Sequence, residues 1–224
     1  MKLGDTTQRL NNGPVTDWLA NLDLPSEAFT RPLVTLPRTE GRGDITIDEI
    51  SDFLFDHGVA SASIKNLVTE IGELIRIARW YSRFTKPSEH ETVAYLAVPL
   101  LRALGWTPQR MAVEWNFVDV ALFERLPRCD ANLRVVVEAK KMGRSCLTAN
   151  SQAKSYADGK VQCHRLIVTD GLRYGIYAKS EDGEFHLYAY MNLTRLRHDY
   201  PALLCKGAED ALLAMAPEWK MAAT

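Results

Sequence analysis

Two carboxylates and one ammonium stand where a sequence could build a metal site. Glu138 and Lys140 follow the valine run 135–137, and Asp119 lies inside the apolar run 117–123. Side chains two residues apart on a β-strand point to the same face, so Glu138 and Lys140 should lie side by side. Charges at the end of a buried strand cost free energy unless they are paired or bind an ion.

If the two strands are neighbours, Asp119 and Glu138 converge, and their oxygens are ligands that suit Mg²⁺. The ammonium of Lys140 could then align or deprotonate a water molecule and offset phosphate charge, as metal-assisted phosphodiester hydrolysis requires. The alternative is a structural Glu–Lys pair, with Asp119 satisfied by backbone donors. The short E-x-K triplet by itself favours that alternative, because such triplets are common.

Hydrophobic periodicity predicts the elements that must position these residues. Helices are expected over 47–55, over 63–78, and over 89–104, 151–157 and 208–215. Strands are expected over 113–123, 133–139, 165–169, 174–178 and 184–190. Prolines punctuate residues 1–43 and predict a loosely ordered arm with one short helix near Trp18.

Two helices carry more specific signals. Thr46 and Glu49 have the spacing of a capping box, which predicts a helix start at 47. The apolar stripe from Ile64 to Ala78 predicts a helix that faces the core, and a partner or dimer helix is the less favoured alternative.

The motifs follow one another in the order helix, strand with Asp119, strand with Glu-x-Lys, helix and strand. The segments that carry this order are 88–92, 99–106, 118–119, 137–141, the pair Gln152 and Tyr156, and 166–171. Together they resemble the PD-(D/E)xK nuclease superfamily and, within it, the N-terminal nuclease domain of type I restriction subunits and their stand-alone relatives. The resemblance covers 88–193, about half of the chain.

The resemblance implies an α/β fold with a restriction-endonuclease-like core over 88–193, in which helices flank a mixed central sheet. The loosely ordered arm (1–43) and a helical extension (44–87) would precede this core, and a C-terminal helical tail (194–224) would follow it. It also implies that Asp119 and Glu138 hold the metal together with the carbonyl of Ala139. Lys140 would be the catalytic lysine.

Further roles follow from the same resemblance. Gln152 and Tyr156 match a Q-x-x-x-Y motif beside the active site, with Gln152 catalytic and Tyr156 supporting, and their spacing places both on one helix face. Glu89 matches a supporting acid on the first helix, and Glu91 is the competing choice. Either glutamate could instead be a helix N-terminal acid favoured by the macrodipole.

The chain departs from the family in two ways. The first half-motif reads Val118-Asp119 where the family has Pro-Asp, and no G-x-x-x-x-G-K-[ST] loop for ATP occurs. The motor of a type I subunit is therefore missing. The chain is expected to act alone or with a motor subunit, a specificity subunit or a second copy of itself.

Charge is unevenly distributed. Residues 44–74 contain seven acids and one base, whereas 134–173 contain eight bases and three acids. Two solvated faces would explain this, but a basic half could also meet a polyanion. Lys141, Arg144 and Lys154 flank the expected site and are candidates for phosphate contacts, with simple solvation as the alternative. The acidic region could lie over the basic site and weaken DNA binding.

Composition narrows the classes of protein. A net charge of −1 excludes an evenly basic nucleic-acid binder, and four cysteines without a C-x-x-C pair argue against a disulfide framework or a structural zinc. No apolar run reaches the ~18 residues of a membrane span. We expect a cytoplasmic, Mg²⁺-dependent endodeoxyribonuclease that accepts Mn²⁺ as a substitute and acts in restriction or defence. A catalytically silent DNA-binding or assembly module on the same fold is the alternative.

Overall fold

The computed structural model describes residues 41–220, so the short helix expected near Trp18 lies outside the described residues. The chain order of helices is α1 (Ile47–Asp56), α2 (Ser61–Phe84), α3 (Glu89–Thr92), the π-turn η3 (Val93–Ala97), α4 (Val98–Ala103), α5 (Asn150–Ala157) and α6 (Ala208–Met215). The strands are β1 (Met111–Trp115), β2 (Val118–Phe123), β3 (Leu133–Ala139), β4 (Arg165–Thr169), β5 (Arg173–Lys179), β6 (Phe185–Asn192), β7 (Asp199–Tyr200) and β8 (Cys205–Lys206).

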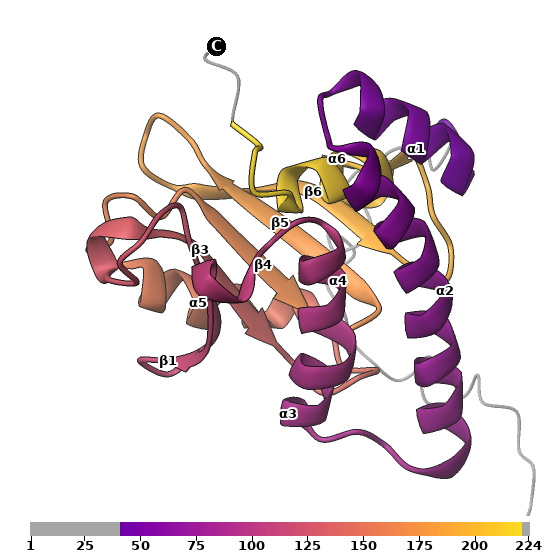
Figure 1. Cartoon of the computed structure of the whole chain (residues 1–224), viewed down its shortest axis with the longest axis horizontal. Helices are drawn as coiled ribbons and strands as arrows, with labels where there is room; N and C mark the ends of the chain where they lie inside the picture. Colours follow the sequence, from indigo (N-terminus) through magenta and orange to yellow (C-terminus); the bar gives the residue numbers. More distant parts are fainter. Residues whose placement is uncertain (1–40, 221–224) are drawn as a thin grey trace, which may run out of the picture. The chain divides into compact units, whose positions relative to one another are not determined.

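All eight strands form one mixed sheet in the order β1-β2-β3-β4-β5-β6-β8-β7 (Figure 1). The β3–β4 and β6–β8 pairs are parallel and the other pairs are antiparallel. Helix α5 lies in the connection between the parallel strands β3 and β4. The resemblance implies a mixed sheet flanked by helices, and the structure has a mixed, mostly antiparallel sheet with helices on its faces. The two-residue strands β7 and β8 were not expected from the sequence.

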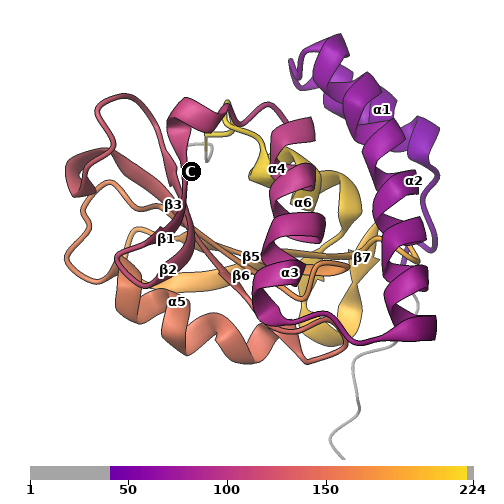
Figure 2. The same ribbon diagram turned by 60° about the horizontal axis from the view of Figure 1, so that its bottom comes forward.

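Helices cover both faces of the sheet (Figure 2). Helices α1, α2, α4 and α6 pack in one hydrophobic core with Val135 and Val137 of β3, and α5 packs in a second core with Val136. This alternation follows from the two-residue period of a strand, because successive side chains point to opposite faces. All three valines are buried, which confirms the expectation of a strand covered on both sides.

The N-terminal helices belong to the core. The capping box of Thr46 and Glu49 is present at the start of α1, as predicted. On α2, Leu67, Ile71 and Leu74 are buried, which confirms most of the core-facing stripe, whereas Val68 is 39% exposed. The idea that 44–74 is a detachable acidic cover is wrong, because this segment supplies core residues from both helices and could not swing away without exposing them.

Two elements differ from the sequence prediction for identifiable reasons. The helix expected over 89–104 is interrupted by η3, where the N–H of Val98 donates to the carbonyl of Val93. Pro99 lacks an N–H and its ring crowds the preceding turn, so a local change of helix type accommodates it. The strand expected over 113–123 is a hairpin that turns at Asn116 and Phe117, both with positive φ. Such turns usually carry glycine, so the Asn116-Phe117 pair does not indicate a turn in the sequence.

Gly171 provides a test of close packing between η3 and the β4–β5 turn. Its φ is +87°, and an added Cβ would lie 2.6 Å from Leu96 Cδ1. We expect Gly171→Ala to lower the free energy of unfolding by about 2–4 kcal/mol, because overpacking adds to the backbone strain. Gly183→Ala is the control, since φ there is +85° but nothing lies within 4 Å. Urea denaturation should show the larger loss at Gly171, and equal losses would contradict the packing argument.

Candidate metal centre

Three carboxylates from three elements meet at the end of the β2–β3 ladder. Asp119 comes from β2, Glu138 from β3 and Glu89 from the start of α3, and one oxygen of each lies within 4.8 Å of the others. The two strands pair antiparallel with Val120 opposite Val137. Asp119, just before Val120, therefore lies opposite Glu138, just after Val137. The convergence that the sequence predicted for neighbouring strands is therefore observed.

The backbone of β3 orients this group. Ala139 packs into the core, so Glu138 and Lys140 on either side of it point to the opposite face. The N–H of Ala139 donates to Asp119 Oδ2 at 2.7 Å, and the N–H of Lys140 donates to the carbonyl of Thr169 at 2.7 Å. These bonds hold the end of β3 between its two neighbouring strands. One Asp119 oxygen thus has a backbone donor, as the structural alternative expected.

Lys140 links the carboxylates to α5. Its ammonium donates to Glu138 Oε1 at 3.0 Å and to Gln152 Oε1 at 2.9 Å, and it lies 4.0 Å from Glu89 Oε1. Gln152 Nε2 in turn donates to the Tyr156 hydroxyl at 3.1 Å, one helical turn away. A continuous polar chain therefore runs from the carboxylates to α5. It includes both residues of the Q-x-x-x-Y motif.

Glu138 carries the feature that a simple Glu–Lys pair does not explain. Its side chain is only 1% exposed, and Oε1 is used by Lys140. The other oxygen, Oε2, is buried and has no hydrogen-bond partner among the described residues. A buried oxygen without a partner is costly, and such atoms in native proteins usually await a ligand, ion or water. The carboxylate set with this orphaned oxygen fits a hard divalent cation such as Mg²⁺.

Burial sets the protonation of the cluster. Burial, together with the charge of Asp119, raises the pKa of Glu138 to about 7, although Lys140 opposes the shift. Burial also raises the pKa of Asp119. For Lys140, burial acts to lower the pKa, but the hydrogen bond and charge of Glu138 outweigh it and raise the pKa. At neutral pH the metal-free protein therefore holds Lys140 as a cation and Glu138 in part as the neutral acid.

The two glutamates of α3 have different surroundings. Glu91 forms a capping box with Ser88: its N–H donates to Ser88 Oγ at 3.1 Å, and its Oε2 accepts from the Ser88 N–H at 2.7 Å. These hydrogen bonds lower the pKa of Glu91. Glu89 instead belongs to the carboxylate cluster. Glu91 is thus the helix-start acid, and Glu89 is the one that faces Asp119 and Glu138.

The three predicted phosphate contacts lie on two elements that carry site residues, the loop after β3 and helix α5. Lys141 and Arg144 are exposed in the loop after β3. Lys154 lies 3.9 Å from Glu184 in the β5–β6 loop.

The basic count over 134–173 overstates the charge that DNA could meet. Arg165 is buried and donates to the carbonyls of Ala214 and Ala216, and Arg173 donates to the buried carboxylate of Asp170. Two of the eight bases are therefore used inside the fold.

Two further interactions involve segments next to the site and could not be predicted from the sequence. Asp170 accepts the N–H of Gly143 at 3.1 Å, which ties the loop after Lys140 to the β4–β5 turn. His90 of α3 lies 3.1 Å from Glu114 of β1. The Asp-Gly pair at 170–171 predicts a turn, but nothing in the sequence indicates that its carboxylate reaches the neighbouring loop.

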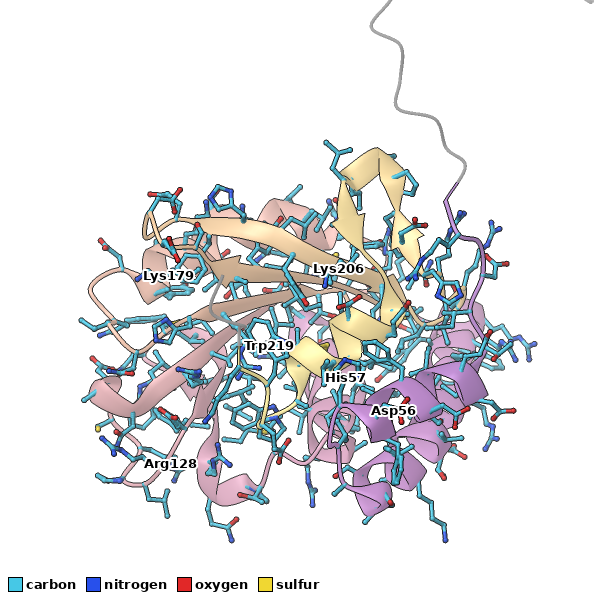
Figure 3. All side chains as sticks on the ribbon, turned by 90° about the horizontal axis from the view of Figure 1, so that it is seen from above. Asp56, His57, Arg128, Lys179, Lys206 and Trp219 are labelled. Carbon is cyan, nitrogen blue, oxygen red and sulfur yellow. The ribbon has the colours of Figure 1, made fainter. Side chains whose placement is uncertain are left out.

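A separate cavity of about 560 Å³ is lined by His57, Tyr188, Lys206 and Trp219, among others. Figure 3 shows His57, Lys206 and Trp219 around α6. None of the residues predicted from the sequence to form the site lines this cavity. This cavity is therefore separate from the candidate metal centre.

Glu138→Gln should stabilise the metal-free protein above neutral pH. Because the folded state binds the Glu138 proton more tightly than the unfolded state, the free energy of unfolding falls as pH rises from the ordinary glutamate pKa to about 7. A full shift is worth about 3 kcal/mol. Glutamine mimics the neutral acid, so we expect a gain of about 1–3 kcal/mol at pH 8 in EDTA and almost none at pH 4.

Glu91→Gln is the matched control and should destabilise, because the pKa of Glu91 is lowered. Thermal unfolding of both variants at the two pH values measures the difference. A loss of stability for Glu138→Gln at pH 8 would show that the ionised carboxylate is well compensated in the fold.

No family model and no curated protein matches this chain. Among solved structures it is weakly similar to a fragment of a candidate HsdR subunit of a type I restriction enzyme from Vibrio vulnificus YJ016, with 19% identity and a TM-score of 0.35. The match covers 58% of this chain and 25% of that chain, so this chain matches only a quarter of the length of that structure. None of the helices in residues 41–220 is both long and apolar enough to cross a membrane.

Proposed function

We propose that this chain is a metal-dependent nuclease of the PD-(D/E)xK type that hydrolyses DNA phosphodiester bonds. The observation that carries the proposal is the buried, unpartnered Oε2 of Glu138, which lies in a group of three carboxylates beside an ammonium. A structural ion pair accounts for the contact with Lys140 but leaves this oxygen and the crowding of three acids unexplained. A divalent cation accounts for both.

Asp119 and Glu138 would hold Mg²⁺, with the carbonyl of Ala139 as a further ligand and Glu89 nearby. Bound there, the ion would polarise the phosphate and acidify the attacking water. The protein's own contribution is to fix the ligands. Asp119 is held by the Ala139 N–H, and Glu138 is held on a strand buried on both faces. Loading the ion requires the Glu138 proton to leave, so binding should strengthen as pH rises towards 7 and above.

Lys140 acts in this proposal as a cation. Its raised pKa keeps the ammonium protonated at neutral pH, which favours charge stabilisation over proton abstraction. The Gln152 amide oxygen accepts a hydrogen bond from this ammonium, and the Gln152 amide nitrogen donates to the Tyr156 hydroxyl. Gln152 and Glu138 together therefore orient the side chain of Lys140. An ammonium held in this way can offset negative charge on a phosphate without reorganising during the reaction.

The biological setting is also part of the proposal. The motif order resembles the nuclease domain of type I restriction subunits, so we place the activity in restriction of foreign DNA. These 224 residues contain no G-x-x-x-x-G-K-[ST] loop, and in this proposal the nuclease works with a motor or specificity subunit. A homodimer is the alternative assembly.

Incubation with plasmid and linear DNA tests the proposal directly. We expect cleavage with Mg²⁺ or Mn²⁺ and none with EDTA. DNA binding without cleavage, across several divalent ions and substrates, would instead support a catalytically silent DNA-binding module.

A further inference from the structure

The C-terminal half of α2 presents a second stripe of residues that the metal centre does not use. Its members recur at the spacing of one helix face and are Arg76, Arg79, Trp80, Arg83 and Phe84. All five are exposed, whereas Leu74, Ala78 and Tyr81 on the opposite face are buried. We call these five residues, with Lys86 just beyond the helix, the basic–aromatic face.

This face is strongly positive. Residues 76–86 contain four bases and no acid, whereas the preceding turns of α2 carry Glu70 and Glu73. Arg76 pairs with Glu73 at 2.7 Å. Arg79, Arg83 and Lys86 form no ion pair with any residue between 41 and 220. Three cations on one short surface without counter-charges suit a polyanion.

Large aromatic rings are interleaved with these cations. Trp80 is 52% exposed and Phe84 is 71% exposed. Their ring centroids lie 5.7 Å apart, and the Trp80 ring lies 5.1 Å from that of Tyr81. Exposed rings beside cations are the combination with which proteins bind unpaired nucleic acid, because bases stack on the rings while phosphates meet the cations.

The basic–aromatic face is close to the candidate metal centre along the chain, because Lys86 precedes Glu89 by three residues. Helix α2 runs beside the column formed by α3, η3 and α4 in both ribbon views (Figures 1 and 2). Tyr81, on the opposite face of α2, donates its hydroxyl to Glu91 at 3.4 Å, so the basic–aromatic face points away from α3 and only the end of α2 approaches it. Ser82 lines a cavity of about 350 Å³ together with Met142 and Gly143, in the loop that follows Lys140.

We propose that the basic–aromatic face binds an unpaired stretch of DNA, which would continue past the end of α2 towards the metal centre. The identity of the ligand rests on the proposed nuclease function, whereas the binding surface rests on its own charges and rings. In a duplex the faces of the bases are stacked on one another, so exposed rings can stack only on unpaired bases. The cations attract either form of DNA, and the rings select the single strand.

Fluorescence anisotropy with oligothymidine tests this in EDTA, where cleavage does not interfere. The probe should be about 20 nucleotides long, more than the ~4–16 that one single-strand site covers. We expect Trp80→Ala and Phe84→Ala each to weaken binding about tenfold. Arg79→Gln with Arg83→Gln should weaken binding and reduce the slope of log affinity against log salt by about 1.4. Trp80 fluorescence should be quenched by the probe, and Trp80→Phe should remove that quenching.

Matched controls separate the surface from general effects. Phe55→Ala removes a ring that is 63% exposed on α1, and Lys65→Gln removes an exposed cation from the other end of α2. Both should bind oligothymidine like the unmodified protein. Duplex DNA of the same length should be affected by the arginine changes but not by the loss of the rings.

Three outcomes would overturn the inference: ring variants that bind oligothymidine normally, ring variants that lose duplex binding equally, or a Trp80→Ala change that alters only the oligomeric state in light scattering. The last would indicate that a second copy of the chain covers this face. The nuclease proposal is tested separately. Asp119→Asn should keep oligothymidine binding. If the protein never cleaves DNA but the ring variants still lose binding, the binding surface is supported and the nuclease proposal is wrong.

Discussion

Asp119→Asn is expected to abolish binding of divalent cations and to reduce DNA cleavage by about 10³-fold or more. The substitution removes a negative charge from a group of three carboxylates, and the neutral amide oxygen is a poor ligand for Mg²⁺. Loss of the ion removes both polarisation of the phosphate and activation of water. Titration calorimetry with Mn²⁺ and a plasmid cleavage assay measure the two effects.

The fold should survive this change. Asparagine keeps an oxygen that can accept the Ala139 N–H, and burial already raises the pKa of Asp119, so removing its charge should not destabilise the protein. Glu91→Gln serves as the control, because Glu91 caps α3 and should be dispensable for cleavage. Normal cation binding by Asp119→Asn would show that Asp119 is not a metal ligand.

Lys140→Met is expected to separate cation binding from cleavage. It removes the ammonium that lies 3.0 Å from Glu138 Oε1 while keeping an unbranched side chain of similar length. Without a competing positive charge, Mn²⁺ should bind as tightly as before or more tightly. Cleavage should fall by about 10²–10³-fold, the usual cost of losing one group that stabilises the transition state.

Lys141→Met is the matched control, because the neighbouring lysine is exposed and forms no ion pair with a carboxylate among residues 41–220. It should weaken DNA binding slightly and leave the rate at saturating DNA unchanged. Undiminished cleavage by Lys140→Met would show that the Lys140 ammonium is not needed for the reaction. Equal losses for the two variants would show that only general charge matters.

The sheet and the convergence of the acids could be predicted because simple rules apply there. Three consecutive valines require a strand buried on both faces, and this burial is observed. The alternation of strand side chains then places Glu138 and Lys140 together without any tertiary information. The position of Asp119 followed once its strand was taken as the neighbour of β3.

The resemblance named Glu89 and kept Glu91 as the competing choice, because both lie in the first turn of one helix. The two differ in which carboxylate bonds back to Ser88, and the spacing of three residues marks Glu91. This capping-box spacing is visible in the sequence and separates the two glutamates. The position of Glu89 beside Lys140 depends on how α3 packs against the sheet, which no local pattern encodes.

Net charge over a segment is a poor guide to the surface charge of this fold. The basic region 134–173 includes Arg165 and Arg173, which are used inside the fold. The bases at the end of α2 begin at Arg76, just beyond the acidic range 44–74, so the net charge of that range gives no sign of them. Net charge over a long segment does not report which side chains face solvent, and only the helix period combined with burial does.

A crystal soaked in Mn²⁺ tests the central claim most directly. Anomalous scattering should place an ion in direct contact with Asp119 and with Glu138 Oε2, the oxygen that has no partner among residues 41–220. The ion should be absent from crystals of Asp119→Asn treated in the same way. If millimolar Mn²⁺ leaves this position empty, or the ion binds elsewhere while Glu138 keeps only its contact with Lys140, then the cluster is a structural ion pair and the chain is not a metal-dependent nuclease.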